Sequence, residues 1–301
     1  ATATAGGALN EIRRQAEEGE DFYQVYCVDR DGRLLGVLPV QRLVVAPPDR
    51  PVRDIMEPPA VVVPPQLDQE EVARLMARYN VAAVPVTDAA GRLLGRVTFD
   101  DVIDVVEQET TEDLLQFGGV SGHEQLAGEW RQAVRSRLPW LFVNTVTAFL
   151  AALVVWVFRD VIDAVILLAV FMPIVAGQGG NAGTQALAVT VRRIALGLIP
   201  RGQETGVVRK EILVGMVNGL VVGVAVGLVA ALVGGTPLLG AVVILAMWGN
   251  LAVAGLVGSV VPLVLQRWGV DPAVASSMFV TPVTDAVGFL LLLGLASWLL
   301  L

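Results

Sequence analysis

Apolar and polar positions divide the chain near residue 138. Beyond this point long apolar runs follow one another, and from Ile212 to Gln266 there is no charged residue at all. About 20 consecutive apolar residues are needed for a helix to cross a bilayer. The pattern therefore predicts five membrane spans: Leu138–Phe158, Val161–Val191, Ile212–Val233, Pro237–Gln266 and Pro272–Leu301.

The second predicted span is interrupted by a polar, glycine-rich stretch, Gly177–Gln185. Unpaired backbone groups are costly in hydrocarbon, so a membrane helix breaks only where the freed groups line an enclosed or water-filled cavity. A broken span of this kind indicates an ion or substrate site near the bilayer midplane. The alternative is close helix packing, which small residues at this spacing allow.

The polar first part of the chain contains a repeat. Tyr23–Val44 and Ala82–Ile103 share a β-run, a glycine turn, a second β-run and a helix start, and the string GRLLG recurs at Gly32 and Gly91, 59 residues apart. Asp68–Arg78 has apolar residues at helical spacing before the second copy. Residues 8–19 supply a matching helix before the first copy. The repeat predicts two similar lobes packed together.

Acidic side chains crowd the end of the second repeat copy and the segment that follows it. Like charges three or four residues apart weaken an isolated helix. A solvated surface helix is one interpretation. The other is a divalent-cation surface, because Mg²⁺ prefers oxygen ligands and can bridge carboxylates that otherwise repel each other. The helix before the second lobe adds three more acids. The two sets are Asp100, Asp101, Asp104, Glu107, Glu109, Glu112 and Asp113, and Asp68, Glu70 and Glu71.

The last predicted span carries one acid, Asp285, near mid-depth. A central aspartate costs at least ~2.5 kcal/mol on insertion scales, so it marks a functional site by default. The polar stretch before it includes Pro282, which frees a backbone carbonyl one turn earlier. Asp285, freed carbonyls and the Asn181 amide would together form an all-oxygen site. The alternative is a hydrogen-bonded staple between helices, with Asn144, Asn218 or Asn250 as the partner.

Charge sharpens the division of the chain. Residues 1–130 carry 11 Arg against 23 Asp and Glu, a net charge of −12, whereas the remainder carries +4. The acidic first part disfavours nucleic-acid binding. Nine of the ten basic residues after residue 130 fall on one side of the predicted membrane, which predicts a cytoplasmic N-terminus and an outside C-terminus. The single cysteine, Cys27, excludes an internal disulfide, and its apolar surroundings predict a buried thiol.

Two resemblances follow from these motifs. The repeat resembles a tandem CBS pair, whose Gly-x-x-Thr-x-x-Asp nucleotide pattern is matched by Gly95, Thr98 and Asp101. The whole chain from about Ala8 resembles the MgtE family of magnesium channels and transporters. The segments that carry this likeness are PIVAGQGGNAGTQ (Pro173–Gln185), WGVDPAVASS (Trp268–Ser277) and TPVTDAVG (Thr281–Gly288).

The resemblance implies an α+β cytosolic tandem CBS pair followed by an all-α, five-helix transmembrane domain with a broken second helix. We expect the CBS pair over residues 1–104, in copies of about 1–52 and 53–104. An acidic connecting helix and linker would occupy residues 105–137, and the pore domain residues 138–301. The family usually has a helical acidic domain before the CBS pair. We expect this domain to be either naturally absent or removed from this chain.

The resemblance also implies a function: a homodimer in the inner cell membrane, not an enzyme, with one Mg²⁺-selective pore on its axis. Asp285 from each subunit would hold a largely hydrated Mg²⁺, with Asn181, Thr281 and Ser277 at or near pore-lining positions. Asp271 would attract cations at the inner mouth and Asp163 at the outer mouth. Internal Mg²⁺ would close the pore by bridging acids of the CBS pair and connecting helix, namely Asp68, Glu70, Asp104, Glu109, Glu112 and Asp113.

Three alternatives stay open at this point. The first is transport of Mn²⁺, Co²⁺ or Zn²⁺, although the lack of His and Cys near the membrane site disfavours selectivity for soft metals. The second is a nucleotide-sensing membrane regulator without transport, binding ATP or AMP at Thr98 and Asp101. In the first lobe Pro39 and Arg42 replace these two residues, which argues against adenosine binding there. The third, an intramembrane aspartyl protease, needs a second acid at the depth of Asp285.

Overall fold

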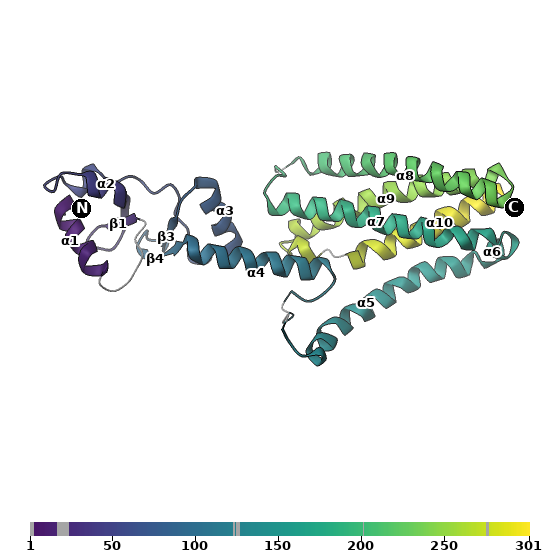
Figure 1. The fold of residues 1–301 in the computed structure, drawn as a ribbon, viewed down its shortest axis with the longest axis horizontal. Helices are drawn as coiled ribbons and strands as arrows, with labels where there is room; N and C mark the ends of the chain where they lie inside the picture. Colours follow the sequence, from purple (N-terminus) through teal and green to yellow (C-terminus); the bar gives the residue numbers. More distant parts are fainter. Residues whose placement is uncertain (1–2, 17–23, 123, 125–126, 201, 275–276) are drawn as a thin grey trace. The chain divides into compact units, whose positions relative to one another are not determined.

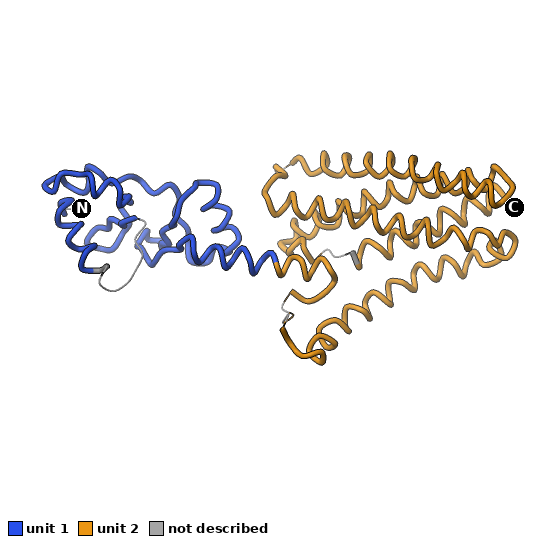
Figure 2. Tube along the Cα trace, in the orientation of Figure 1, with its two compact units in different colours: residues 1–110 blue, residues 111–301 orange. Residues whose placement is uncertain are grey.

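The computed structural model describes residues 3–16, 24–122, 124, 127–200, 202–274 and 277–301. The chain forms two compact units, residues 1–110 and 111–301 (Figure 2). Helix α4, Phe99–Phe117, runs through the border between them. The expected domain limits at residues 104 and 137 stay a prediction. The first of these limits falls inside this continuous helix.

The first unit is built from two β-hairpins of the same design. The first repeat contains α1 (Ala5–Ala16), β1 (Gln24–Val28), β2 (Leu34–Pro39), α2 (Val40–Val45) and the 3₁₀-helix η1 (Val52–Asp54). The second contains α3 (Gln69–Tyr79), β3 (Ala83–Thr87), β4 (Leu93–Thr98) and the start of α4. Gln24 pairs with Pro39 in one hairpin and Ala83 with Thr98 in the other, and both hairpins shift register just before their turns.

The two turns explain why the GRLLG string recurs. Gly32 and Gly91 have φ of 78° and 79°, a left-handed conformation that glycine adopts without steric cost. Before each turn an aspartate, Asp29 or Asp88, accepts two backbone N–H groups of its own turn. The turns also pair with each other, since Leu34 donates to the Gly91 carbonyl and Leu93 to the Gly32 carbonyl, each at 2.9 Å. The predicted two-lobed repeat is thereby confirmed.

Each lobe has its own apolar core. The core of the first is formed around Cys27, Leu38 and Leu43, and that of the second around Val63, Met76 and Val84. Cys27 is buried, as its apolar surroundings predicted, and this burial raises the pKa of its thiol. A raised pKa keeps the sulfur protonated and unreactive at neutral pH.

The second unit is a bundle of long helices (Figure 1). Its elements are α5 (Trp130–Val157), α6 (Arg159–Ala164), α7 (Leu167–Ala195), α8 (Glu204–Gly234), α9 (Pro237–Arg267), the 3₁₀-helix η2 (Pro272–Val274) and α10 (Ser277–Leu299). Helix α9 packs against α7, α8 and α10, so it lies at the centre of the bundle, whereas α5 packs chiefly on α10. Val175, Met247 and Leu292 are among the fully buried side chains of the shared core.

Four helices in the described part of the chain are long and apolar enough to cross a membrane, by length and composition: α5, α8, α9 and the Met278–Leu299 part of α10. Helix α7 is as long as these but is not among them, and it carries four glycines with Gln178 and Asn181 in its middle. The expected count of five spans therefore stays a prediction.

The predicted position of the interruption, Gly177–Gln185, was wrong. Helix α7 runs without a break through Gly177–Gln185. Its glycines instead admit neighbouring helices, because a Cβ atom at Gly179 would lie 2.3 Å from Asn250 Nδ2 and one at Gly183 would lie 2.4 Å from Val280 Cγ1. Close packing by small residues, the alternative interpretation, is what the glycines provide. The chain does break earlier, between the end of α6 at Ala164 and the start of α7 at Leu167.

Candidate functional site

The two membrane motifs singled out in the sequence lie against each other. A Cβ atom at Gly180 of α7 would lie 3.5 Å from Thr281 Cγ2 and 3.7 Å from Thr281 Oγ1 of α10, which is ordinary van der Waals contact. Next to this contact the Asn181 side chain is exposed, and Thr281 and Asp285 are half-buried. The structure therefore brings the glycine-rich motif and the last acidic motif together along one helix pair.

Asp285 has no hydrogen-bond or ion-pair partner among the residues that the structure describes. The staple considered for it is not formed by Asn250, whose amide donates to the Val175 carbonyl at 3.0 Å. The hydroxyl of the preceding residue, Thr284, donates to carbonyls of its own helix, those of Val280 at 3.2 Å and Thr281 at 2.9 Å. The Asp285 carboxylate is thus left available for a ligand from outside its own chain.

Two of the other predicted pore residues lie at the ends of the bundle. Asp271 precedes η2 and accepts the Ala273 N–H at 2.9 Å, so this exposed carboxylate caps the 3₁₀ turn that leads into α10. Asp163 is exposed on α6, which lies at the end of the bundle where α10 finishes (Figure 1). The two acids therefore flank opposite ends of the helix that carries Asp285. The Ser277 side chain lies outside the described part of the chain.

Acids predicted to sense internal Mg²⁺ meet where α3 begins. Asp68 is the N-cap of α3 and accepts the Glu70 N–H at 2.9 Å. Between these two residues, Gln69 donates a hydrogen bond to the Glu109 carboxylate of α4. The start of α3 and the middle of α4 are thus neighbours. Asp104 is exposed one and a half turns before Glu109 on α4.

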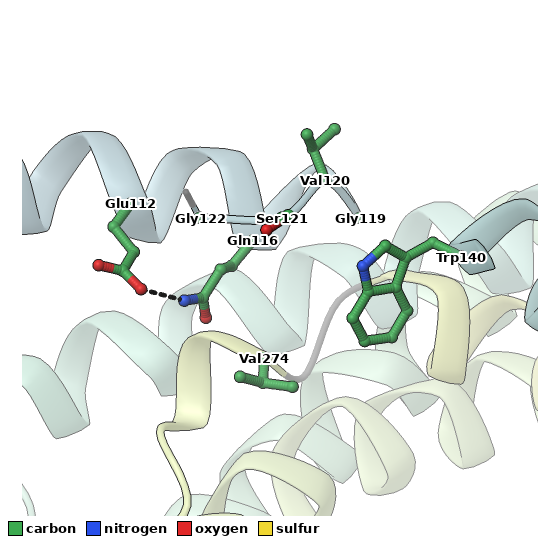
Figure 3. A pocket seen from close by; sticks show the side chains of 8 residues that line it. All are labelled: Glu112, Gln116, Gly119, Val120, Ser121, Gly122, Trp140 and Val274. Atoms are coloured by element: carbon green, nitrogen blue, oxygen red, sulfur yellow. Dashed lines mark hydrogen bonds between the residues drawn. The ribbon is translucent and has the colours of Figure 1, made fainter. Parts of the chain in front are cut away.

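Glu112 and Asp113 belong to the last turns of α4, in the second unit. Glu112 accepts a hydrogen bond from Gln116 Nε2 at 2.8 Å (Figure 3). The buried Gln116 Oε1 has no hydrogen-bond partner in the described part of the chain. Both side chains line a cavity of about 180 Å³. Its lining is Glu112, Gln116, Gly119, Val120, Ser121, Gly122, Trp140 and Val274. The connecting helix therefore ends on a partly polar pocket beside the first long membrane helix.

The predicted metal ligands do not form a single coordination shell within one chain. Among the residues that the structure describes, no group of three or more His, Cys, Asp or Glu side chains is close enough to hold a metal ion. A cation bound at the regulatory acids or at Asp285 therefore needs ligands beyond the described acids, such as water.

The residues of the nucleotide motif are bonded to each other. Thr98 immediately precedes α4 and donates through its hydroxyl, at 2.8 Å, and its backbone N–H, at 3.1 Å, to Asp101 Oδ2. Asp101 is the third residue of α4, so its carboxylate supplies half of a capping box. These two hydrogen bonds hold the pKa of Asp101 below its ordinary value. In the first lobe the equivalent Arg42 instead forms an ion pair with Glu57.

Sequence reasoning missed Glu211 and considered Asn250 only as a staple partner of Asp285. Glu211 of α8 is buried and lies 3.8 Å from Arg193 of α7. Asn250 of α9 is fully buried, and its Oδ1 has no hydrogen-bond partner among the residues that the structure describes. Asn250 stands out in the sequence as an amide inside a long uncharged run, but only the structure shows that it touches α7 and α10 rather than Asp285.

The fold and the site together define a class of protein. A two-lobed hairpin repeat with an acidic helix precedes a bundle that contains helices able, by length and composition, to span a membrane. The bundle also holds a half-buried carboxylate, Asp285, without a partner among the described residues. Residues 172–295 match the MgtE family, described as a divalent cation transporter, and residues 52–108 match the CBS domain. The chain belongs to the MgtE family.

Known relatives agree with this assignment. The chain is similar to the magnesium transporter MgtE of Thermus thermophilus, with 38% identity over 99% of this chain and 66% of the relative. It is also similar to that of Enterococcus faecalis, with 35% identity over 99% of this chain and 65% of the relative. The chain thus spans about two thirds of the length of these relatives. They are named as transporters, not enzymes, in agreement with the expectation from the sequence.

Among solved structures, the chain is similar to the cytosolic domain of the Mg²⁺ channel MgtE in complex with ATP. The identity is 49%, the TM-score is 0.34, and the match covers 35% of this chain and 42% of that one.

Proposed function

We propose that this protein conducts Mg²⁺ across the cell membrane as a homodimer, with Asp285 of each subunit facing a shared axial pore. The observation that carries the proposal is the unpartnered, half-buried Asp285 beside the contact of α7 and α10. A carboxylate at this depth is costly unless it meets a cation, water or a polar cavity. Two such carboxylates on a dimer axis offset part of the cost of bringing a divalent ion into the membrane.

The neighbouring side chains suit a hydrated cation. The exposed Asn181 amide and the Thr281 hydroxyl offer neutral oxygens on the same helix pair as Asp285. Mg²⁺ gives up its water ligands reluctantly and is usually held through one or two carboxylates with several waters retained. The membrane potential drives the entry of a doubly charged cation by about 4.6 kcal/mol per 100 mV, twice the value for a single charge.

Flux measured in proteoliposomes tests this proposal. The assay compares the native chain with Asp285→Asn, which keeps the side-chain shape and removes the charge, and with Asp160→Asn as a control for an exposed acid on α6. We expect Mg²⁺ flux to be lost in Asp285→Asn and kept in Asp160→Asn. Undiminished flux in Asp285→Asn would refute the role of Asp285. Parallel assays with Mn²⁺, Co²⁺ and Ca²⁺ separate a Mg²⁺-selective pore from a general divalent-cation pore.

We propose further that internal Mg²⁺ closes this pore by binding the acids of α3 and α4. The support is the high density of carboxylates on α4 and the hydrogen bond that joins Gln69 to Glu109. Carboxylates gathered in this way repel each other, so a bridging cation favours the state in which they are closest. A shift from mostly open to mostly closed needs ~5.5 kcal/mol of differential binding, which several weak sites can supply together.

Neutralising three of these acids tests the gating. In the triple variant Glu109→Gln, Glu112→Gln, Asp113→Asn, flux should persist at internal Mg²⁺ concentrations that close the native pore. The control variant Asp49→Asn, Asp54→Asn removes two exposed acids of the first lobe and should close normally. If internal Mg²⁺ inhibits the triple variant as strongly as the native protein, these acids are not the sensor.

A second regulator, ATP or AMP, is proposed for the second lobe. The support is the Thr98 hydroxyl and the Asp101 carboxylate, two groups suited to a ribose, side by side at the end of β4. A bound ribose would exchange the hydrogen bond between them for bonds to the ligand. Calorimetric titration of the native chain and of Asp101→Ala with ATP and AMP tests this, and binding that survives in Asp101→Ala would exclude this position.

A further inference from the structure

Asn250 occupies an unusual place for an amide. It lies on the central helix α9, it is fully buried, and its Nδ2 donates to the Val175 carbonyl of α7 at 3.0 Å. Glycines on both neighbouring helices make room for it. A Cβ atom at Gly179 of α7 would lie 2.3 Å from Nδ2, and one at Gly288 of α10 would lie 2.7 Å from the same atom. One side chain therefore fits between two helices that it touches simultaneously.

The position of this amide along the helices connects it to the proposed pore. Gly179 precedes Asn181 by two residues, and Gly288 follows Asp285 by three. At 1.5 Å per residue, the two contacts lie about 3 Å and 4.5 Å along the helix axes from the candidate pore residues. Asn250 thus touches α7 and α10 within about one helical turn of the side chains that would meet the ion.

The chemistry of the amide favours a role other than apolar packing. Its Oδ1 has no partner in the described structure, and burying an unpaired oxygen is unfavourable. An apolar side chain of similar volume would avoid this cost. An amide bonded to one particular carbonyl accepts only one axial position of the partner helix, whereas apolar contacts tolerate sliding. A buried asparagine fixes helix register in coiled coils in the same way, at a cost in stability.

We propose that Asn250 is a positioning residue that sets the axial register of α7 against α10, and with it the separation of Asn181 and Asp285 in the pore. The proposal rests on the proposed function for its consequence, namely cation selectivity. The register itself is a property of the bundle and can be measured without any transport.

A disulfide assay measures the register directly. In a Cys27→Ser background, the paired substitutions Gly180→Cys and Thr281→Cys place two thiols where the structure has van der Waals contact. We expect rapid cross-linking when Asn250 is present and a clear loss of yield with Asn250→Leu, because sliding by one residue moves the thiols by about 1.5 Å. An unchanged yield in Asn250→Leu would overturn the proposal.

Glycine substitutions test the same contact with the amide in place. Gly288→Ala should alter the ratio of Mg²⁺ to Ca²⁺ flux by roughly threefold or more, within the range of couplings between residues in contact. In an Asn250→Ala background the smaller side chain leaves room for the added methyl group. Adding Gly288→Ala to this background should therefore leave the ratio of Mg²⁺ to Ca²⁺ flux unchanged. Gly294→Ala is the matched control, since a Cβ atom at Gly294 of α10 meets nothing within 4 Å.

The outcomes separate this inference from the proposed function. A purely structural role for Asn250 would lower the amount of folded protein and scale both fluxes equally, and an unchanged ratio in Gly288→Ala would therefore overturn the positioning role. If Asp285→Asn keeps full flux, the pore assignment fails, while the cross-linking yield still decides whether Asn250 sets the register.

Discussion

The close approach of α8 and α9 supports a quantitative prediction about the bundle. Gly215 of α8 lies against the backbone of α9, and a Cβ atom there would be 2.1 Å from the Leu251 carbonyl oxygen. Contact at a normal distance needs a separation more than ~1 Å larger. Because the obstacle is backbone rather than a flexible side chain, Gly215→Ala must push the two helices apart. Overpacking of this kind costs about 1–3 kcal/mol.

A gain in helix propensity opposes this cost and has to be separated from it. Replacing glycine by alanine in a helix contributes up to ~1 kcal/mol of stability where nothing obstructs the methyl group. Gly206 of α8 is such a position, because a Cβ atom there meets nothing within 4 Å. Gly206→Ala should therefore leave the protein as stable or more stable. Gly215→Ala should be the less stable variant by about 1–3 kcal/mol.

The assay is unfolding in mixed micelles with an increasing fraction of sodium dodecyl sulfate, followed by circular dichroism and compared between the two variants. The difference between them isolates the steric clash, since both carry the same chemical change on the same helix. Equal stability of Gly215→Ala and Gly206→Ala would refute the backbone contact of α8 with α9. It would also weaken the inference that a methyl group at Gly288 presses on Asn250.

The remaining predictions concern the capping box at the start of α4. Asp101→Ala removes the acceptor for the Thr98 N–H and hydroxyl and should destabilise the first unit by ~1 kcal/mol in thermal unfolding. Because the pKa of Asp101 is lowered in the folded state, this carboxylate contributes stability above its ordinary pKa of 3.8, and the contribution is lost as the pH falls through the lowered value. Asp101→Asn should therefore flatten the acid limb of the stability profile, and a profile with the native slope would contradict this.

Most of the fold could be predicted from short-range patterns in the sequence. The repeat could be predicted because a left-handed glycine and an aspartate that accepts the turn N–H groups are needed in both hairpins, which leaves the same letters in both copies. The long apolar runs predicted where the long helices of the bundle lie, and α9 begins and ends within one residue of its predicted span. Other helices extend beyond the runs at their polar ends, as α5 does from Trp130. Apolar composition marks the part of a helix in lipid, not the part in water.

The glycine-rich motif shows where local rules fail. Four glycines near polar side chains satisfy the pattern of a broken helix as well as that of a packed one, since both need small residues. The choice depends on what faces each glycine. Asn250 and Val280 lie 71 and 97 residues further along the chain than Gly179 and Gly183, their respective neighbours, and no local pattern specifies these pairings.

The intact helix α7 limits the ligands that the proposed pore can offer to a cation. The carbonyls of an unbroken helix are engaged in its own hydrogen bonds, so Gly177–Gln185 supplies few free backbone oxygens. The ligands then have to come from side chains, namely the exposed Asn181 amide, Thr281 and Asp285. Because one chain offers a single acid, Asp285, at this place, direct coordination of a dehydrated Mg²⁺ is disfavoured. Contact through retained water is therefore the expected mode, and it makes selectivity depend on the spacing of these side chains, which Asn250 is placed to control.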